Sequence, residues 1–249
     1  MSSMLLFQEG IRLLTSILCF YISAQLRGRQ LSEPEDRLAW NAFRVWWAGL
    51  GLTTMISLFN AILPLLGILN LTVYVALAQV NILVICIALW GLLSYLVFLF
   101  TGKANARRYL AIFYFLFFIA LAVYAISLQP SGVELEEGVA TIQYDGQVSP
   151  AYILVLSVFL LAPQLLASFA YFSFYFRVRE RTQKYRVLLV SVSIFVWFSS
   201  PLLARALSLS EQDWWPLASS SITLIAAIVI YWAYYPPKFL QERLRVASV

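Results

Sequence analysis

Residues 72–100 read TVYVALAQVNILVICIALWGLLSYLVFLF, a run without a single charged side chain. A helix of about 20 apolar residues is long enough to cross the hydrocarbon core of a bilayer. The run lacks the period-two alternation of apolar and polar residues that a membrane β-strand requires. Because lipid offers no partners to backbone N–H and C=O groups, the remaining option for a spanning segment is a helix. The run therefore predicts a transmembrane helix.

Six further apolar segments of similar length lie on either side of this run. The chain of 249 residues is 62% hydrophobic and 12% charged, with a mean hydropathy of +0.82, whereas a globular domain carries about 25% charged residues. These patterns predict an all-α integral membrane protein in which a single domain, residues 1–249, forms a bundle of seven transmembrane helices. The predicted spans are 4–26, 40–66, 72–100, 109–128, 150–176, 187–207 and 214–235.

Lysine and arginine occupy alternate connections between the predicted spans. Every one of them except Arg12 and Arg205 lies in or beside the first, third or fifth connection, or in the C-terminal tail. Cytoplasmic loops of membrane proteins are enriched in these residues. The distribution predicts an N-terminus outside and a C-terminus in the cytoplasm, and the free thiols and short loops favour a prokaryotic plasma membrane.

The fifth connection holds the densest basic group. Since the basic residues are divided among short loops and form no single patch, nucleic acid is not an expected partner. Membrane orientation and anionic lipid head groups are sufficient to explain them. If a separate cytoplasmic or membrane protein partner docks on the chain, we expect it to use the C-terminal tail and this group, which comprises Arg177, Arg179, Arg181, Lys184 and Arg186.

The connection at 129–149 is the only sizeable one on the predicted outer side, and it contains acidic but no basic residues. Its 139–148 part alternates apolar and polar residues and includes Asp145-Gly146, a strong turn dipeptide. A small extracellular β-hairpin between the fourth and fifth spans is therefore expected. Recognition of a partner and a purely solvated cap both remain open as its role.

Few residues in the sequence suit catalysis. There is no histidine, which removes the usual haem ligand, imidazole metal sites and Ser-His-Asp triads. Cys19 and Cys86 lie inside apolar runs, where a thiol usually packs as a small hydrophobe. Glu9 is the only carboxylate within a span, whereas a proton relay needs several. We expect no enzyme activity, no cofactor and no metal site.

Charged residues inside a span are candidates for function because their burial is costly. Glu9 and Arg12 lie three positions apart on one face of the first helix and can pair. They either belong to a functional site or form a self-neutralised pair without function, in which Arg12 reaches to water. Arg205 follows Ser199-Ser200-Pro201. Pro201 removes a backbone donor and predicts a kink, and the adjacent serines can bond to the freed carbonyls.

Uncharged polar residues at intermediate depth complete a predicted outward-facing cavity for a small ligand between the helices. Hydrogen bonding between helices is the competing interpretation of these side chains. The expected ligand-binding residues are Glu9, Arg12, Asn60, Gln79, Asn81, Gln164, Ser199, Ser200 and Arg205.

Three features of the chain are informative together: the helix count, the short turn TGKANARRY at 101–109, and the exit Tyr235-Pro236-Pro237 followed by a basic stretch. In combination they resemble the seven-helix membrane sensor region of bacterial histidine kinases. This resemblance implies a receptor-like or sensor-like protein. Because residues 238–249 hold no output domain, a separate partner would have to receive the signal.

Two alternatives of other classes remain. The Pro163-Gln164 dipeptide resembles the motif of the PQ-loop transporters and implies a small-solute transporter. The exposed aromatic residues and bland spans suit a structural or accessory subunit of a larger membrane complex. The helix count also resembles that of the microbial rhodopsins, but the last span, 214–235, has no lysine to bind retinal.

Overall fold

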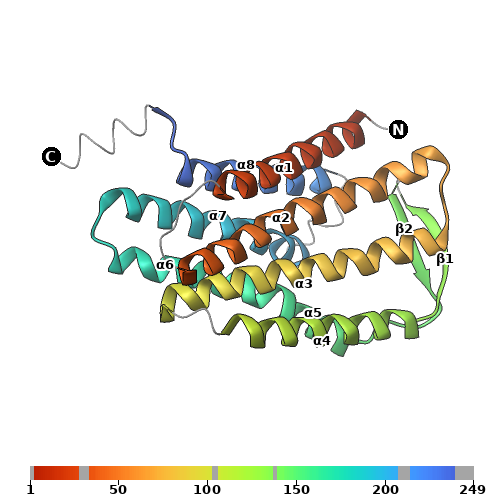
Figure 1. Cartoon of the computed structure of the whole chain (residues 1–249). Helices are drawn as coiled ribbons and strands as arrows, with labels where there is room; N and C mark the ends of the chain where they lie inside the picture. Colours follow the sequence, from red (N-terminus) through yellow and green to blue (C-terminus); the bar gives the residue numbers. More distant parts are fainter. Residues whose placement is uncertain (1–2, 28–33, 103–105, 137–138, 207–213, 239–249) are drawn as a thin grey trace. The chain divides into compact units, whose positions relative to one another are not determined.

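The computed structural model describes residues 3–27, 34–102, 106–136, 139–206 and 214–238, with the backbone alone at 3–4, 34–35, 136, 139 and 201–206. These residues are largely helical, and the chain divides into two compact units, Met1–Leu160 and Leu161–Val249, each described here by itself (Figure 1). Within these described ranges, six stretches of helix are long and apolar enough to cross a membrane, as expected of a multi-pass membrane protein. They are Leu5–Arg27, Asp36–Leu66, Leu71–Thr101, Ala106–Ser127, Pro150–Arg177 and Trp215–Tyr234.

The described part of the first unit contains four long helices, each packed against the next one in the chain (Figure 1). A short 3-10 turn, Leu63–Leu66, follows the second helix, and the left-handed Gly67 (φ 73°) ends it. The side chain of Asn70 then accepts hydrogen bonds from the N–H groups of Thr72 and Val73 and so begins the third helix. The four helices are α1 (Ser3–Arg27), α2 (Pro34–Ile62), α3 (Leu71–Thr101) and α4 (Ala106–Ser127).

Glycine allows α2 and α3 to pack closely. A Cβ on Gly91 would lie 2.4 Å from the carbonyl oxygen of Ala42 and 3.0 Å from the backbone nitrogen of Trp46. On the opposite helix, a Cβ on Gly49 would lie 2.6 Å from the Cβ of Ala88. Both contacts are closer than side chains tolerate, so the two glycines fix the distance and the antiparallel register of this pair.

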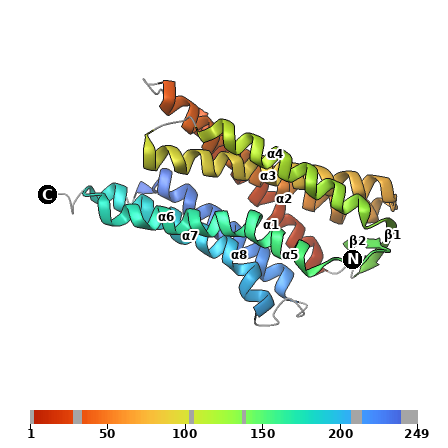
Figure 2. The same ribbon diagram turned by 90° about the horizontal axis from the view of Figure 1, so that it is seen from below.

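The predicted hairpin is present at one end of this unit. Strand β1 (Pro130–Glu136) pairs antiparallel with β2 (Val139–Tyr144). The strands contact α2 and α3, and both views place them at the end of the unit where α1 begins (Figures 1 and 2). The N-terminus and the hairpin thus share one end, as the sequence predicts.

The turn of the hairpin was predicted at the wrong place. The chain reverses between Glu136 and Val139, and residues 137–138 lie outside the described part. Asp145 and Gly146 instead close the base of the hairpin, because their N–H groups donate to the carbonyls of Gln129 and Leu128 at 3.1 and 3.0 Å. Residues 147–149 are too few to form a strand before the next helix begins, so β2 pairs with the segment that precedes it.

The fifth predicted span is continuous but irregular. It consists of α5 (Pro150–Leu156), a π-helical turn (Ser157–Leu161) and α6 (Ala162–Arg177). Pro163 has no N–H and therefore interrupts the hydrogen-bond ladder at this point, which is a common cause of such widened turns. The division between the two units falls in the same turn.

In its described residues, the second unit contains three helices, and the central one packs against the other two. A reciprocal bond joins α6 to this central helix, because the hydroxyls of Ser168 and Ser191 each donate to the other residue's carbonyl at 2.7 Å. Besides α6, the unit contains α7 (Arg181–Ala206) and α8 (Trp215–Tyr234).

The predicted span 187–207 corresponds to α7, which is not among the six helices long and apolar enough to cross. Three basic residues, Arg181, Lys184 and Arg186, occupy its beginning, and residue 207 lies outside the described part. A seventh crossing, a single domain and the sides on which the termini lie stay predictions.

Candidate ligand site in the first unit

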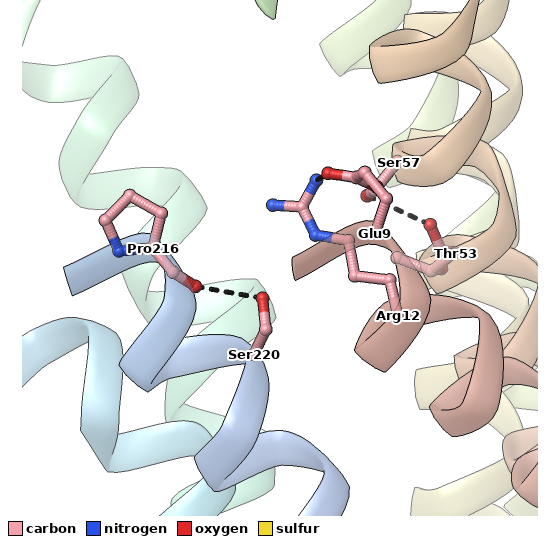
Figure 3. Close-up of polar contacts among 6 residues, drawn as sticks. All are labelled: Glu9, Arg12, Thr53, Ser57, Pro216 and Ser220. Carbon is pink, nitrogen blue, oxygen red and sulfur yellow. Dashed lines mark hydrogen bonds and ion pairs between the residues drawn. The ribbon is translucent and has the colours of Figure 1, made fainter. Parts of the chain in front are cut away.

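Glu9 and Arg12 form an ion pair on α1, as their spacing predicts. Nη1 of Arg12 lies 2.7 Å from Oε1 of Glu9 (Figure 3). Glu9 exposes only 5% of its surface, whereas the Arg12 side chain keeps 26% of its own. The second carboxylate oxygen, Oε2, is buried and has no hydrogen-bond partner within the described residues. A buried acceptor left unpaired in this way destabilises the fold.

Glu9 belongs to a polar stripe on the face of α1 that packs against α2. Ser16 and Ser23 follow it at intervals of seven residues, which places all three on one face of the helix. The Ser16 hydroxyl donates to the carbonyl of Gly51 at 2.8 Å. The Ser23 hydroxyl donates to the carbonyl of Arg44 at 3.1 Å, and Nε of Arg44 donates back to the carbonyl of Ser23 at 3.2 Å.

This antiparallel register places Glu9 level with Leu58 of α2. Figure 3 draws Glu9 and Arg12 on α1 together with Thr53 and Ser57 on α2. The Ser57 hydroxyl is satisfied, since it donates to the carbonyl of Thr53 at 3.1 Å. A serine can satisfy a backbone carbonyl, but an ionised carboxylate has no hydrogen to donate. Glu9 therefore leaves an acceptor unpaired, whereas Ser16 and Ser23 on the same face each donate a hydrogen bond to α2.

Further buried oxygens lie where α2 packs against α3. Thr53 and Asn60 lie one turn and three turns beyond Gly49, on the same face of α2, and Asn81 lies two turns before Ala88 on the facing side of α3. Oγ1 of Thr53 and Oδ1 of Asn60 and Asn81 are buried and have no hydrogen-bond partner in the described part of the chain. Acceptors thus accumulate in one half of this unit.

Gln79 shares this depth but not this face. It lies two residues from Asn81, which turns its side chain about 200° around the helix. Its Oε1 is also buried without a partner among the described residues. The five predicted residues of the first unit therefore occupy the half nearer the hairpin but divide among three surfaces: the α1–α2 contact, the α2–α3 contact and another side of α3.

The remaining four predicted residues belong to the second unit: Gln164, Ser199, Ser200 and Arg205. The first three are buried. The Ser200 hydroxyl donates to the carbonyl of Trp197 at 3.0 Å, which is the carbonyl that Pro201 leaves without its usual N–H donor. The prediction for the serine is thus confirmed, and α7 continues as a helix past the proline to Ala206. The side chain of Arg205 lies outside the described residues.

The predictions missed the serines that connect helices within each unit. Ser16 and Ser23 bond to α2, and Ser168 and Ser191 bond α6 to α7. The interval of seven from Glu9 to the first two was visible in the sequence and could have revealed them. Other serines bond only to their own helix, as Ser220 does to the carbonyl of Pro216 at 2.9 Å (Figure 3).

Among the described residues, no three His, Cys, Asp or Glu side chains lie close enough to hold a metal ion. Both cysteines are buried free thiols. No protein-family model matches the chain, and no curated protein matches its sequence. Within the described part of the chain, the strongest indication of a site is the buried, unpaired Oε2 of Glu9.

Proposed function

We propose that the chain is a receptor-like or sensor-like protein of a prokaryotic plasma membrane, in which a small ligand binds at Glu9 and the signal passes to a separate partner. The observation that supports this is the unused Oε2 of a carboxylate that exposes only 5% of its surface. In a span this oxygen has little access to water, so a donor group that enters the protein is the natural partner.

The pair Glu9–Arg12 defines the chemistry of the ligand. Oε2 of Glu9 accepts a hydrogen bond from an ammonium, amide or hydroxyl group. The guanidinium of Arg12 carries several N–H donors, of which Nη1 serves Glu9, and its exposed part can donate to an acceptor on the same ligand. The buried oxygens of Thr53 and Asn60 face α3 and lie outside this pair. A small polar molecule that carries both a donor and an acceptor, such as an amino-group-bearing zwitterion, fits the Glu9–Arg12 arrangement.

The partner that receives the signal binds the basic group at the junction of α6 and α7. Arg177 ends α6 and Arg181 begins α7, and both are exposed. Lys184 lies nearby, with its Nζ 5.5 Å from the centre of the Tyr175 ring. Because the N-terminus of a helix carries partial positive charge, these cations at the start of α7 repel it and attract anions. A partner with an acidic surface therefore suits this end.

The test is purification in mild detergent followed by mass spectrometry of every small molecule and protein that is retained. A receptor retains a small molecule, and the Glu9→Gln variant loses it, because the amide replaces the Oε2 acceptor with a donor. The amide can also donate to a carbonyl of α2, so this variant is expected to unfold at a temperature no lower than the original protein. Glu180→Gln, an identical change in an exposed connection, is the matched control and retains the molecule.

The other outcomes identify the competing functions. Retention of stoichiometric membrane proteins without any small molecule would contradict the receptor function and indicate an accessory subunit. Uptake of the retained molecule into liposomes that contain only this protein would contradict the receptor function and indicate a transporter. A retained molecule that Glu9→Gln and Arg12→Ala leave in place would refute the site.

A further inference from the structure

A hollow of about 370 Å³ lies between α3 and α4. No described residue of α1 or α2 lines it, so it is separate from the Glu9 site. Its volume falls within the range of small-molecule sites, about 300–1,000 Å³. No charged residue lines it. Cys86 and Tyr114 form its floor and expose 2% and 3% of their surfaces, while Ile87 and Phe115 form its rim and expose 43% and 59%.

The two helices that form the hollow, α3 and α4, are each long and apolar enough to cross a membrane. Its rim residues are exposed, and α4 buries little of its surface in the protein. In a bilayer this face contacts acyl chains. An apolar hollow of this kind excludes water, because water there would lack hydrogen-bond partners.

One end of the hollow is held in place by a hydrogen bond between the two helices. Trp90, which lines the hollow, donates from its indole Nε1 to the carbonyl of Arg107 at 2.9 Å. Arg107 lies in the first turn of α4, so this bond fixes the beginning of α4 against α3. The walls are therefore preformed and the site does not depend on a mobile loop.

A cation lies directly beyond this end. Arg108 is exposed and precedes Ala111 and Phe115 by three and seven residues, which places all three on the same face of α4. With a rise of 1.5 Å per residue, Arg108 lies about 4.5 Å along the helix from Ala111 and about 10 Å from Phe115. A positive charge thus stands at one end of an apolar groove on a membrane-facing surface.

We propose that this groove binds one acyl chain of an anionic phospholipid whose phosphate lies against Arg108. The charge distribution of the chain places this end of α4 in the cytoplasmic leaflet. The groove supplies apolar contact for the chain, and the guanidinium pairs with the head group, an arrangement that an uncharged lipid satisfies only in part. A transmembrane helix of a partner, about 10 Å wide, is too large to enter the hollow, and a polar solute would find no partners inside it.

The experiment uses the full-length protein in nanodiscs of equal parts phosphatidylglycerol and phosphatidylcholine, with a phosphatidylglycerol probe that carries a photoreactive diazirine in its acyl chain. After irradiation, peptide mass spectrometry maps the adducts. We expect them on the peptides that contain Ile87 and Ala111–Phe115, and we expect Ala111→Trp to abolish them by filling the hollow. Ala120→Trp, an exposed position on the opposite side of α4, is the matched control and leaves them unchanged.

The head group is tested separately by competition with unlabelled lipid. Phosphatidylglycerol should compete about fivefold better than phosphatidylcholine, and Arg108→Gln should remove this preference while the adducts persist. Arg179→Gln changes an exposed arginine in the connection between α6 and α7 and is the matched control, which should keep the preference for phosphatidylglycerol. Adducts spread over other helices, or equally strong after Ala111→Trp, would overturn the proposal; the adduct map of the unaltered protein alone decides this if that variant fails to fold.

Discussion

Replacing Gly91 with alanine should separate α2 from α3 and lower the stability of the protein. The added Cβ would lie 2.4 Å from the carbonyl oxygen of Ala42 and 3.0 Å from the backbone nitrogen of Trp46. An ordinary contact begins at about 3.4 Å, so the gap must widen by about 1 Å. Both neighbouring atoms belong to the backbone of α2 and cannot rotate away. The helix has to move as a body.

The magnitude follows from two opposing effects. Overpacking of a well-packed core costs about 1–3 kcal/mol, and this contact belongs at the upper end because no side chain can yield. Alanine in place of glycine within a helix contributes about 1 kcal/mol in the opposite direction. The expected net loss is about 2 kcal/mol, which changes the unfolding equilibrium about thirtyfold.

The assay is unfolding in detergent micelles by increasing fractions of sodium dodecyl sulfate, followed by tryptophan fluorescence. Gly91→Ala should unfold at a lower fraction than the original protein. Gly10→Ala is the matched control, because no heavy atom lies within 4 Å of its added Cβ, and it should be neutral or stabilising. If Gly91→Ala were as stable as Gly10→Ala, the close approach of α2 and α3 would be refuted.

Three further predictions concern single contacts. Gly49→Ala should destabilise through the methyl group of Ala88, 2.6 Å from the added Cβ, and Ala88→Gly should restore part of the loss in a thermal melt; no restoration would contradict this contact. Ser200→Ala should lower the free energy of unfolding by about 1 kcal/mol because it leaves the carbonyl of Trp197 unpaired. In a Pro201→Ala background, where a backbone N–H returns to this carbonyl, the same change should lower it little. Equal losses in both backgrounds would exclude this explanation. Ser168→Ala and Ser191→Ala should each cost about 0.6 kcal/mol and their losses should add, since each hydroxyl makes its own bond; a double variant no less stable than either single one would show that the two bonds depend on each other.

The helical spans were predictable because lipid leaves the backbone so few options. The run at 72–100 became Leu71–Thr101, and 109–128 became Ala106–Ser127. Hydrophobicity alone determined these boundaries within a few residues. The position of the hairpin turn was not predictable from Asp145-Gly146, since a turn dipeptide needs a strand on both sides and only one was available.

Depth along a helix was predictable, but direction around it was not. Gln79 and Asn81 are equally deep, yet only Asn81 lies on the face of α3 that packs against α2. Trp46 and Trp47 lie near the beginning of an apolar run, where tryptophan often faces a membrane interface, and both are fully buried in the protein. They pack with Phe43, whose ring stacks on that of Tyr95 at 4.4 Å. The partner helix that decides such cases is not visible in local sequence.

The stripe Glu9–Ser16–Ser23 departs from its own pattern at the residue that we propose binds a ligand. Each serine satisfies a carbonyl of α2, and a third hydroxyl or amide at position 9 would extend the same pattern. A carboxylate breaks the pattern and leaves a buried acceptor unpaired, although Arg12 compensates its charge. Residues that violate a local rule in this way concentrate at functional sites, where the lost stability is recovered when a ligand binds. A ligand that supplies the missing donor to Oε2 should therefore raise the stability of the folded protein, by an amount set by its concentration relative to its Kd.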